Sequence, residues 1–493
     1  MDRLISFLRS KPVFFLLLPL FFIFHGFTEN FNAVPFADAF WLLLVYLIAS
    51  LVIFFLSWLF FRNHLKAAFL SFCLMAFHFF FGSMQDLLKK SFTDAFVTRY
   101  SFLLPFFLAL FIILVVFLKK RKAPLLKASF YLNVLLCLLI ITDLGWLTSK
   151  IFLRKSRPFT RSGQAIKCDS CTKPDIYFLV FDEYSSSTAL KELWNYDNSE
   201  MDSFLVQKGF KLLSYSRSNY NFTEFSIAST LNMNWLKIND PNACTVKDYN
   251  NCFELIKNNQ VTLMLQSLGY KISNYSIFDV DKNPSPVTED FLPLKTKLIT
   301  AQTFLSRIRK DLFYHLLTGK FEIKWLTRDL VYITRHNNEK IINATIKESL
   351  NSSTGPRFIY SHIEMPHPPF YYDKNGKEKD KQKLLEENKN PNINSYLDYL
   401  PSTNKVMKQL VNSIIDHAKR PVVILLLGDH GFRANQPQNY HFRNFNAVYT
   451  SSGNYRGFYE NMSSVNEFRI LFNNLFLTSF PPLKDSTIFL TDK

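Results

Sequence analysis

The stretch Pro421-Val-Val-Ile-Leu-Leu-Leu-Gly-Asp-His-Gly431 decides which fold this sequence can adopt. Its apolar run of about six residues, bounded by a proline and a glycine, predicts a strand that is buried on both faces of a sheet. Asp429 and His430 follow this strand directly. They place a carboxylate oxygen and an imidazole nitrogen at one point, and zinc and manganese accept both ligands. Alone, the pair is weak evidence for a metal site, because many such pairs are a turn residue beside a structural histidine.

Further apolar runs of the same kind lie upstream in the chain. They begin at Ile176 and Arg357, and helix-like stretches such as Leu298–Leu317 and Ser402–Ala418 separate the runs. Strands that alternate with helices predict an α/β domain with a mainly parallel central sheet. In such sheets ligands bind beyond the carboxyl ends of the strands. We therefore expect the functional site to lie where Asp429 and His430 are.

The amino-terminal third of the chain is apolar and predicts a membrane domain. Five stretches are each near the roughly 20 residues that cross a bilayer, namely Pro12–Phe27, Phe40–Phe61, Leu65–Met84, Ser101–Leu118 and Leu126–Thr148. The first has no small-residue cleavage pattern, so it is interpreted as an anchor. We predict a domain of five transmembrane helices over residues 1–150, a linker over 151–172 and a catalytic α/β domain over 173–493.

The loops between these stretches predict the orientation in the membrane. Basic residues lie between the second and third stretches and between the fourth and fifth, whereas Glu29–Asp38 contains no lysine or arginine. The positive-inside rule then puts the amino terminus in the cytoplasm and the chain after about Ser149 on the outer side. The loop Gln85–Tyr100, with its own basic residues, opposes this assignment. We expect a multi-pass protein of the bacterial inner membrane with a periplasmic catalytic domain.

The formal net charge of +17 has two contributions. Part of it lies in the loops that set topology, and the rest favours contact with anionic lipid headgroups. Nothing in the sequence resembles a nucleic-acid-binding module, and no nucleic-acid partner is expected. Outside the cytoplasm, closely spaced cysteines favour disulfides. The simplest pairs are Cys168 with Cys171 and Cys244 with Cys252, and a four-cysteine zinc site is the alternative.

Candidate site residues follow the other predicted strands. Asp182 and Glu183 end the strand that begins at Ile176, and either acid could be a ligand. Thr223 precedes a helix-compatible run, so its hydroxyl lies where a helix amino terminus favours phosphate. A divalent metal could activate that hydroxyl by lowering its pKa. The alternative is that Thr223 merely caps the helix.

Histidines complete the set of candidates. His367 lies between prolines that prevent a regular helix and hold it on a stiff loop. Such a histidine can ligate a metal, bind a phosphoryl oxygen or protonate a leaving group. His362, at the end of the strand from Arg357, and His441, shortly after Asp429 and His430, are additional candidates for substrate binding. His362 is equally compatible with a place in the core.

Together these features resemble the membrane-bound sulfatase-like transferases of the alkaline phosphatase superfamily. Phosphoethanolamine transferases and lipoteichoic acid synthases have the most similar layout. The resemblance implies that Asp182, Thr223, Asp429 and His430 bind the metal, zinc or manganese. It further implies that Thr223 is the nucleophile, and that His367 contacts the substrate phosphate or a second metal. Those transferases usually have a glutamate where this chain has Asp182, so Glu183 remains an alternative ligand.

The resemblance implies a reaction and its partners. A phosphoryl-type headgroup, of the phosphoethanolamine or phosphoglycerol class, would pass from a phospholipid through a phosphothreonine to an envelope glycan or lipid. An ester hydrolase that acts on phosphodiesters or sulfate esters is one alternative, and a non-catalytic membrane scaffold is another. Sulfatases proper use a Cys/Ser-x-Pro-x-Arg signature, which this sequence lacks. That absence argues against classical sulfate-ester hydrolysis.

Overall fold

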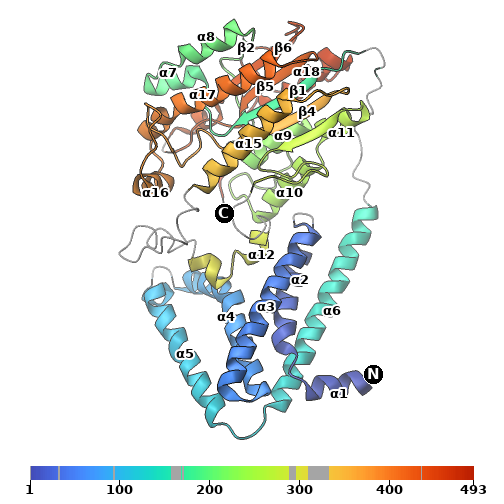
Figure 1. Ribbon diagram of the computed structural model, residues 1–493, viewed down its shortest axis with the longest axis vertical. Helices are drawn as coiled ribbons and strands as arrows, with labels where there is room; N and C mark the ends of the chain where they lie inside the picture. The colour runs from blue at the N-terminus through green and yellow to red at the C-terminus, as the bar shows by residue number, and fades with distance from the viewer. Residues whose placement is uncertain are drawn as a thin grey trace. The chain divides into compact units, whose positions relative to one another are not determined.

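The computed structural model describes residues 2–31, 34–92, 95–156, 168, 171–287, 296–308, 332–434 and 436–492. These residues form two compact units. The first combines the amino-terminal helices, up to residue 156, with residues 296–308. The second, catalytic unit contains the other described residues (Figure 1). The predicted boundaries at 150 and 173 differ from this division at one place, because residues 296–308 group with the helices that precede the catalytic unit.

The first unit is built from apolar helices. They are α1 (Asp2–Ser10), α2 (Phe14–Glu29), α3 (Phe36–Phe61), α4 (His64–Ser91), α5 (Tyr100–Lys120) and α6 (Leu126–Ser156), with a short 3₁₀ turn η1 (Phe96–Thr98) before α5. Of the described helices, α3 to α6 are long and apolar enough to cross a membrane. The predicted first span forms α2, which is apolar but has only 16 residues. The helical membrane domain is therefore confirmed, with four long helices and one shorter one.

Small polar residues join the helices where they pack closely. Ser50 of α3 donates from Oγ to the carbonyl of Phe15 in α2 at 2.8 Å, and Ser71 of α4 donates to the carbonyl of Ser50 at 3.1 Å. Both serines are fully buried. Small residues at helix crossings let backbones approach, and their hydroxyls provide hydrogen bonds that lipid cannot. This packing joins α2, α3 and α4.

The segment from 296 to 308 belongs to this unit although it lies between two strands of the catalytic sheet in the sequence. It contains α12 (Lys297–Thr300). A Cβ on Gly26 of α2 would lie 2.6 Å from Ile299, and one on Gly82 of α4 would lie 2.6 Å from the Gln302 carbonyl. The Gly82 N–H donates to that carbonyl at 2.8 Å. The predicted helix Leu298–Leu317 is thus interrupted after one turn and resumes at residues 304–308, and its part beyond 308 lies outside the described residues.

The catalytic unit is organised around a six-stranded sheet of order β2-β6-β5-β1-β4-β3. The strands are β1 (Asp175–Phe181), β2 (Lys211–Leu212), β3 (Lys271–Tyr275), β4 (Arg357–Ile363), β5 (Val422–Gly428) and β6 (Asn446–Thr450). β5, β1, β4 and β3 run parallel, and β6 pairs antiparallel with β5 and β2. All seven residues of β1, β4 and β5 are buried. The prediction of a mainly parallel sheet with these three strands is confirmed.

Helices cover both faces of this sheet (Figure 1). One layer contains α9 (Thr223–Asn232), α10 (Val246–Lys257), α11 (Gln260–Ser267) and α18 (Glu467–Phe476), whose apolar side chains cluster with alternate strand residues such as Ile176 and Phe178. α15 (Ile333–Leu350) packs on β4 and on α17 (Ile393–Asp416). The remaining elements are α7 (Ser187–Trp194), α8 (Ser199–Gln207), α16 (Lys381–Lys389), η3 (Gln438–Phe442) and η4 (Ser464–Asn466). This is a three-layer α/β/α arrangement.

Polar side chains set where several of these helices begin. Asn392 accepts the Ser395 N–H at 2.9 Å and starts α17. Thr245 and Asp248 form a capping box at the start of α10. Such side chains satisfy amide groups that have no partner within the helix. The cap at Asn392 explains why α17 begins nine residues before the predicted helix at Ser402, since Pro401 is tolerated inside it.

A buried carboxyl at the start of α18 makes the unit's stability depend on pH. Glu467 is fully buried, and Asn446 Nδ2 donates to its Oε2 at 2.9 Å. Burial raises the pKa of Glu467 from 4.5 to about 7, although the Asn446 hydrogen bond opposes this. The folded state therefore holds the proton more tightly than the unfolded state. The stabilisation is complete below pH 4.5 and is lost as pH rises through about 7.

We expect Glu467→Gln to remove this dependence, because glutamine keeps the hydrogen bond and does not ionise. At pH 8 the variant should be more stable than the wild type by roughly 3 kcal/mol, and near pH 4.5 the two should be alike. Thermal unfolding of both proteins across this range would measure the difference. Parallel curves at all pH values would contradict the prediction.

Candidate metal centre

The sheet brings the ends of β1 and β5 side by side. The two strands are parallel neighbours, and Phe181 pairs with Gly428 in their register. The next residues, Asp182 and Asp429, therefore leave the sheet together. A Cβ on Gly428 would lie 2.3 Å from the Tyr184 carbonyl, so the glycine is required by close approach. Gly428 is thus needed for space at this position.

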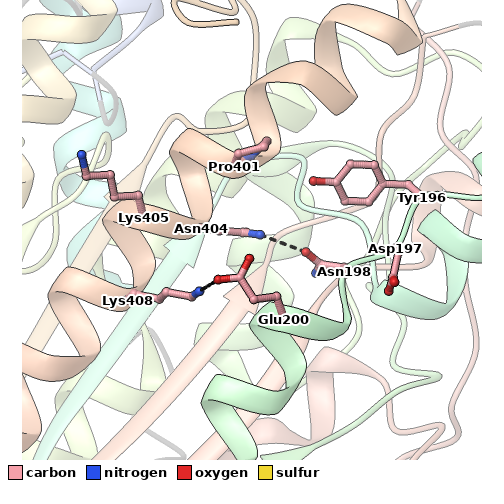
Figure 2. A pocket seen from close by; sticks show the side chains of 8 residues that line it. All are labelled: Tyr196, Asp197, Asn198, Glu200, Pro401, Asn404, Lys405 and Lys408. Atoms are coloured by element: carbon pink, nitrogen blue, oxygen red, sulfur yellow. Dashed lines mark hydrogen bonds and ion pairs between the residues drawn. The ribbon is translucent and has the colours of Figure 1, made fainter. Parts of the chain in front are cut away.

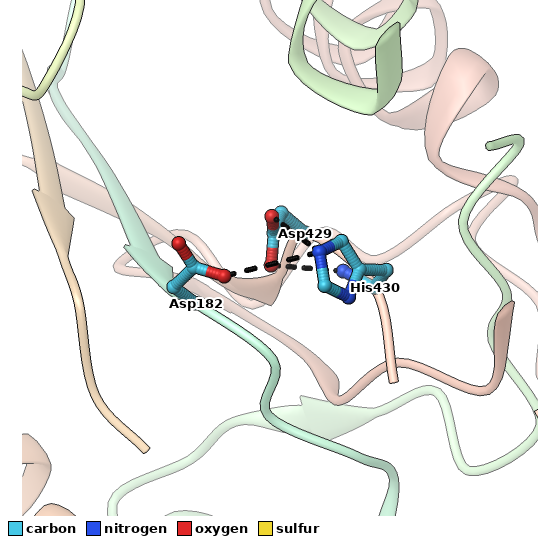
Figure 3. A group of neighbouring side chains, drawn as sticks. All are labelled: Asp182, Asp429 and His430. Atoms are coloured by element: carbon cyan, nitrogen blue, oxygen red, sulfur yellow. Dashed lines mark hydrogen bonds and ion pairs between the residues drawn. The ribbon is translucent and has the colours of Figure 1, made fainter. Parts of the chain in front are cut away.

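Asp182, Asp429 and His430 converge as potential ligands, and all three are buried (Figure 3). Their ligand atoms lie within 4.8 Å of one another. His430 Nε2 lies 3.3 Å from Asp429 Oδ2 and 3.9 Å from Asp182 Oδ1. Two carboxylates and one imidazole at these separations form one side of a site for a divalent cation.

The hydrogen bonds around the cluster leave one oxygen of each aspartate without a partner among the described residues. Asp429 Oδ1 accepts the N–H groups of Glu183 at 3.0 Å and of His430 at 2.9 Å. Asp429 Oδ2 and Asp182 Oδ1 are buried without hydrogen-bond partners among the described residues. His430 Nδ1 lies 2.9 Å from the Gly431 carbonyl, which can only accept, so Nδ1 carries the proton and Nε2 offers its lone pair. Buried polar atoms of this kind fit a metal ion.

Thr223 lies beside the cluster. It is the first residue of α9, and the preceding cap residue is Phe222. Thr223 Oγ1 lies 3.1 Å from His430 Nε2 and donates to it. Ser226, one turn further, donates to the Asp429 carbonyl at 2.6 Å and ties the helix to the end of β5. The hydroxyl of Thr223 is therefore directed at the cluster, and the structure does not use it as a helix cap.

Two histidines approach Asp182 from β4 and the loop after it. His362 is fully buried, and its Nε2 lies 3.6 Å from Asp182 Oδ2. Burial opposes the protonation of both His362 and His367, but carboxylates outweigh it and raise the pKa of each imidazole. For His367 these are chiefly Asp182 and Glu183. Its Nδ1 donates to the Pro368 carbonyl at 2.7 Å, which directs Nε2 away from the loop backbone.

The pKa values of the two aspartates shift in opposite directions. Burial opposes the ionisation of Asp182, but His367 and His362 hold the pKa of its carboxyl below the ordinary value. Burial and the neighbouring Asp182 charge raise the pKa of Asp429. Two carboxylates this close repel each other unless a cation lies between them. The pair is thus electrostatically suited to binding a divalent ion.

The structure gives His441 a different environment. Its Nε2 lies 3.0 Å from the Gln436 carbonyl, and its ring packs on Phe489. Burial lowers the pKa of its imidazole. Its backbone carbonyl accepts the Gly431 N–H at 2.8 Å, so this residue supports the loop that follows His430. It is not part of the group formed by Asp182, Asp429 and His430.

Sequence reasoning missed the partner of Glu183. The Glu183 side chain is buried and receives a hydrogen bond of 2.8 Å from Arg433 Nε. Glu183 has a positive φ of 62°, which turns it away from Asp182. The structure thus places Asp182, not Glu183, in the cluster. The position of Arg433, three residues after His430, is the signal that could have identified it.

The cysteines follow the prediction only in part. Cys168 and Cys171 form a disulfide, as expected. Cys244 and Cys252 are buried free thiols in the apolar layer that contains α9 and α10, so the second predicted disulfide is not formed. Cys252 is part of α10, and Cys244 lies before it, beside the carboxyl-terminal residues that pair with it. Both thiols pack against apolar side chains of the core, which accounts for their burial in the absence of a disulfide bond.

A surface pocket between α8 and α17 does not include the cluster residues (Figure 2). Lys408 donates to Glu200 at 2.6 Å, and Asn404 donates to Asn198 at 2.9 Å. These side chains satisfy one another across the pocket.

The mainly parallel α/β/α unit thus holds a buried cluster of two carboxylates and one imidazole, which could hold a metal ion, beside the hydroxyl at the start of α9. A family model described as Sulfatase matches residues 248–466. This range includes His367, Asp429 and His430 and begins after Asp182 and Thr223. Residues 248–466 of the chain thus match the Sulfatase model, and four helices that are long and apolar enough to cross a membrane precede them in the chain.

Several solved structures are similar to this chain. The periplasmic domain of EptC from Escherichia coli in complex with zinc has 11% identity and a TM-score of 0.39, covering 66% of this chain and 88% of its own. The periplasmic domain of the phosphoethanolamine transferase EptC from Campylobacter jejuni has 12% identity and a TM-score of 0.36. The match covers 62% of this chain and 89% of that domain. The integral membrane lipooligosaccharide phosphoethanolamine transferase EptA from Neisseria meningitidis has 11% identity and a TM-score of 0.34. The match covers 90% of this chain and 89% of that chain. No curated protein matches the chain.

Proposed function

We propose that the protein transfers a phosphoryl-type headgroup, of the phosphoethanolamine or phosphoglycerol class, from a phospholipid to a glycan or lipid of the cell envelope. The observation that carries this proposal is the 3.1 Å separation of Thr223 Oγ1 and His430 Nε2 beside two unpartnered carboxylate oxygens. A hydroxyl at a helix amino terminus, next to a cation site, is suited to attack phosphorus.

Asp182, Asp429 and His430, with the hydroxyl of Thr223, would hold zinc or manganese. When bound, such an ion supplies Lewis-acid chemistry, since it lowers the pKa of an adjacent hydroxyl and neutralises phosphoryl oxygens. The amino-terminal N–H groups of α9 add positive potential at the same place. These features attract the phosphodiester and orient it against Thr223.

The chain's own residues then carry out two displacements. Thr223 Oγ, whose proton has been released to solvent, forms a bond to phosphorus as the bond from phosphorus to the diacylglycerol oxygen breaks. His367, whose imidazole has a raised pKa, gives its Nε2 proton to the departing oxygen. The phosphothreonine is next attacked by an acceptor hydroxyl, which returns a proton to His367, and Thr223 is restored. His362 orients Asp182 and contacts the substrate phosphate, and His441 supports the loop beside it.

The membrane helices would confine this reaction to a lipid donor at the outer face of the bacterial inner membrane. Lys66 Nζ donates to the Lys119 carbonyl at 3.4 Å, which joins the two basic loops at one end of the bundle. Arg9 lies over the Phe130 ring at this end. The positive-inside rule assigns that end to the cytoplasm, so the chain leaves α6 on the periplasmic side.

The test is mass spectrometry of the protein purified from its native membrane. We expect an adduct on the peptide that contains Thr223, with a mass that identifies the transferred headgroup, and its absence from Thr223→Ala. Addition of an acceptor should discharge the adduct. A Thr223 that stays unmodified after incubation with phospholipid and manganese would contradict the proposal. Release of free headgroup without an acceptor would instead assign the ester hydrolase.

A further inference from the structure

We propose that Arg433 is a positioning residue for Thr223 and the residue that makes the site receptive to an anionic phosphodiester. This inference rests on the proposed function. Arg433 Nε donates to Glu183 Oε1 at 2.8 Å, and its Nη1 donates to the Asn221 carbonyl at 3.1 Å. Its guanidinium lies 5.6 Å from the centre of the Phe222 ring. One side chain thus connects the loop after β5 with the end of β1 and with the start of α9.

The contact with Asn221 places the nucleophile. Asn221 and Phe222 are the two residues before Thr223, and Phe222 is the cap residue of α9. Asn221 Nδ2 also donates to the Leu490 carbonyl at 3.0 Å, so the turn is held on its far side as well. A guanidinium is a planar fork that fixes two acceptors in one orientation. Arg433 therefore fixes the start of α9, and with it the orientation of the Thr223 side chain, relative to Glu183.

The contact with Glu183 sets the charge of the site. Glu183 lies between two other acids, because it follows Asp182 and its N–H donates to Asp429. Its carboxylate is buried. A divalent ion would balance Asp182 and Asp429, and the guanidinium of Arg433 balances Glu183. Without Arg433 a buried negative charge would remain beside Thr223, and it would repel an incoming phosphodiester.

The other end of α9 provides a matched control. Arg469 of α18 donates from Nη1 to the Met233 carbonyl at 2.7 Å, at the residue that caps the carboxyl end of α9. Its guanidinium lies 5.5 Å from the centre of the Phe480 ring. Arg469 therefore makes the same two kinds of contact as Arg433, but at the end of the helix that lacks Thr223. Loss of Arg469 should affect stability alone.

The experiment uses full-length protein in detergent, loaded with manganese, and bis(p-nitrophenyl) phosphate as the probe. For Arg433→Gln we expect kcat to fall about 100-fold because the nucleophile is misplaced, with metal content unchanged. Arg433→Lys should recover part of the rate, since lysine restores the charge without the fork. Arg433→Gln combined with Glu183→Gln should exceed Arg433→Gln in kcat/KM by about tenfold, because the unpaired charge is gone.

Arg469→Gln should lower the unfolding temperature and keep the rate of the wild type. The inference is overturned if Arg433→Gln reacts within about twofold of the wild type, or if Arg469→Gln loses as much activity as Arg433→Gln. Loss of metal in proportion to activity would also overturn it. A second measurement, the binding of inorganic phosphate to the manganese-loaded protein, separates failure of the Arg433 inference from failure of the proposed function. Arg433→Gln should bind it about tenfold more weakly even if wild-type Thr223 carries no adduct.

Discussion

The Asp429→Asn protein should fold as the wild type does and lose its metal. An amide oxygen can accept the same N–H groups of Glu183 and His430 that Asp429 Oδ1 accepts now. The other oxygen, Oδ2, has no hydrogen-bond partner among the described residues. Asparagine replaces it with an NH₂ group, which does not ligate a cation. We expect affinity for zinc or manganese to fall at least about 100-fold, and adduct formation on Thr223 to disappear with it.

Elemental analysis of the purified variant and thermal unfolding of its metal-free form would measure both parts of this prediction. Metal-free Asp429→Asn should unfold no earlier than the metal-free wild type, because burial and Asp182 disfavour the charge of Asp429. Asp248→Asn is the control. Asp248 is a buried aspartate of the α10 capping box, so its loss should reduce stability and leave the metal in place. A metal content equal to that of the wild type in Asp429→Asn would exclude Asp429 as a ligand.

Arg357→Met should destabilise the catalytic unit by about 3–5 kcal/mol, the usual cost of breaking a buried ion pair. Arg357 Nη2 donates to Asp175 Oδ2 at 2.6 Å, and its Nη1 donates to the Glu348 carbonyl at 2.7 Å. The side chains of Arg357 and Asp175 are only 7% and 3% exposed. They are the first residues of β4 and β1, so the methionine variant leaves the buried Asp175 carboxylate with its longer contact of 3.5 Å to Arg420 Nε as its only ion pair among the described residues.

Arg357→Met combined with Asp175→Asn should recover part of the lost stability, because residue 175 then carries no buried negative charge. Chemical denaturation of the three proteins would measure both differences. The pair also fixes the register that places Asp182 and His362 near each other at the opposite ends of these strands, where Val180 pairs with His362. If Arg357→Met were as stable as the wild type, the ion pair would have no part in holding that register.

Much of the catalytic sheet could be predicted because its central strands are mostly apolar. The runs at Ile176 and Val422 are apolar on both faces, so a sheet covered on both sides is the arrangement that buries them. Parallel strands end at one edge, and the residues after them meet there. For this reason Asp182, Asp429 and His430 could be selected from the sequence, and the structure brings them within ligand distance of one another.

Other features depended on contacts between residues far apart in the chain. Glu183 is an equally acidic neighbour of Asp182, and only its positive φ and its bond to Arg433 direct it away from the cluster. His441 Nε2 lies beside the Gln436 carbonyl and its ring packs on Phe489, and the sequence indicates neither contact. The local sequence does not identify such partners, because these residues come into contact only when loops that are distant in the chain pack together.

The sequence by itself determined the two kinds of unit, the parallel sheet and the residue types at its edge, because these follow from hydrophobic periodicity and from the order of the elements. Only the tertiary structure decided that residues 296–308 belong with the membrane helices, where Gly26 and Gly82 make room for them. The same holds for the thiols of Cys244 and Cys252 and for the orientation of Arg433. In each case the outcome depends on the shape and charge of partners that are distant in the chain.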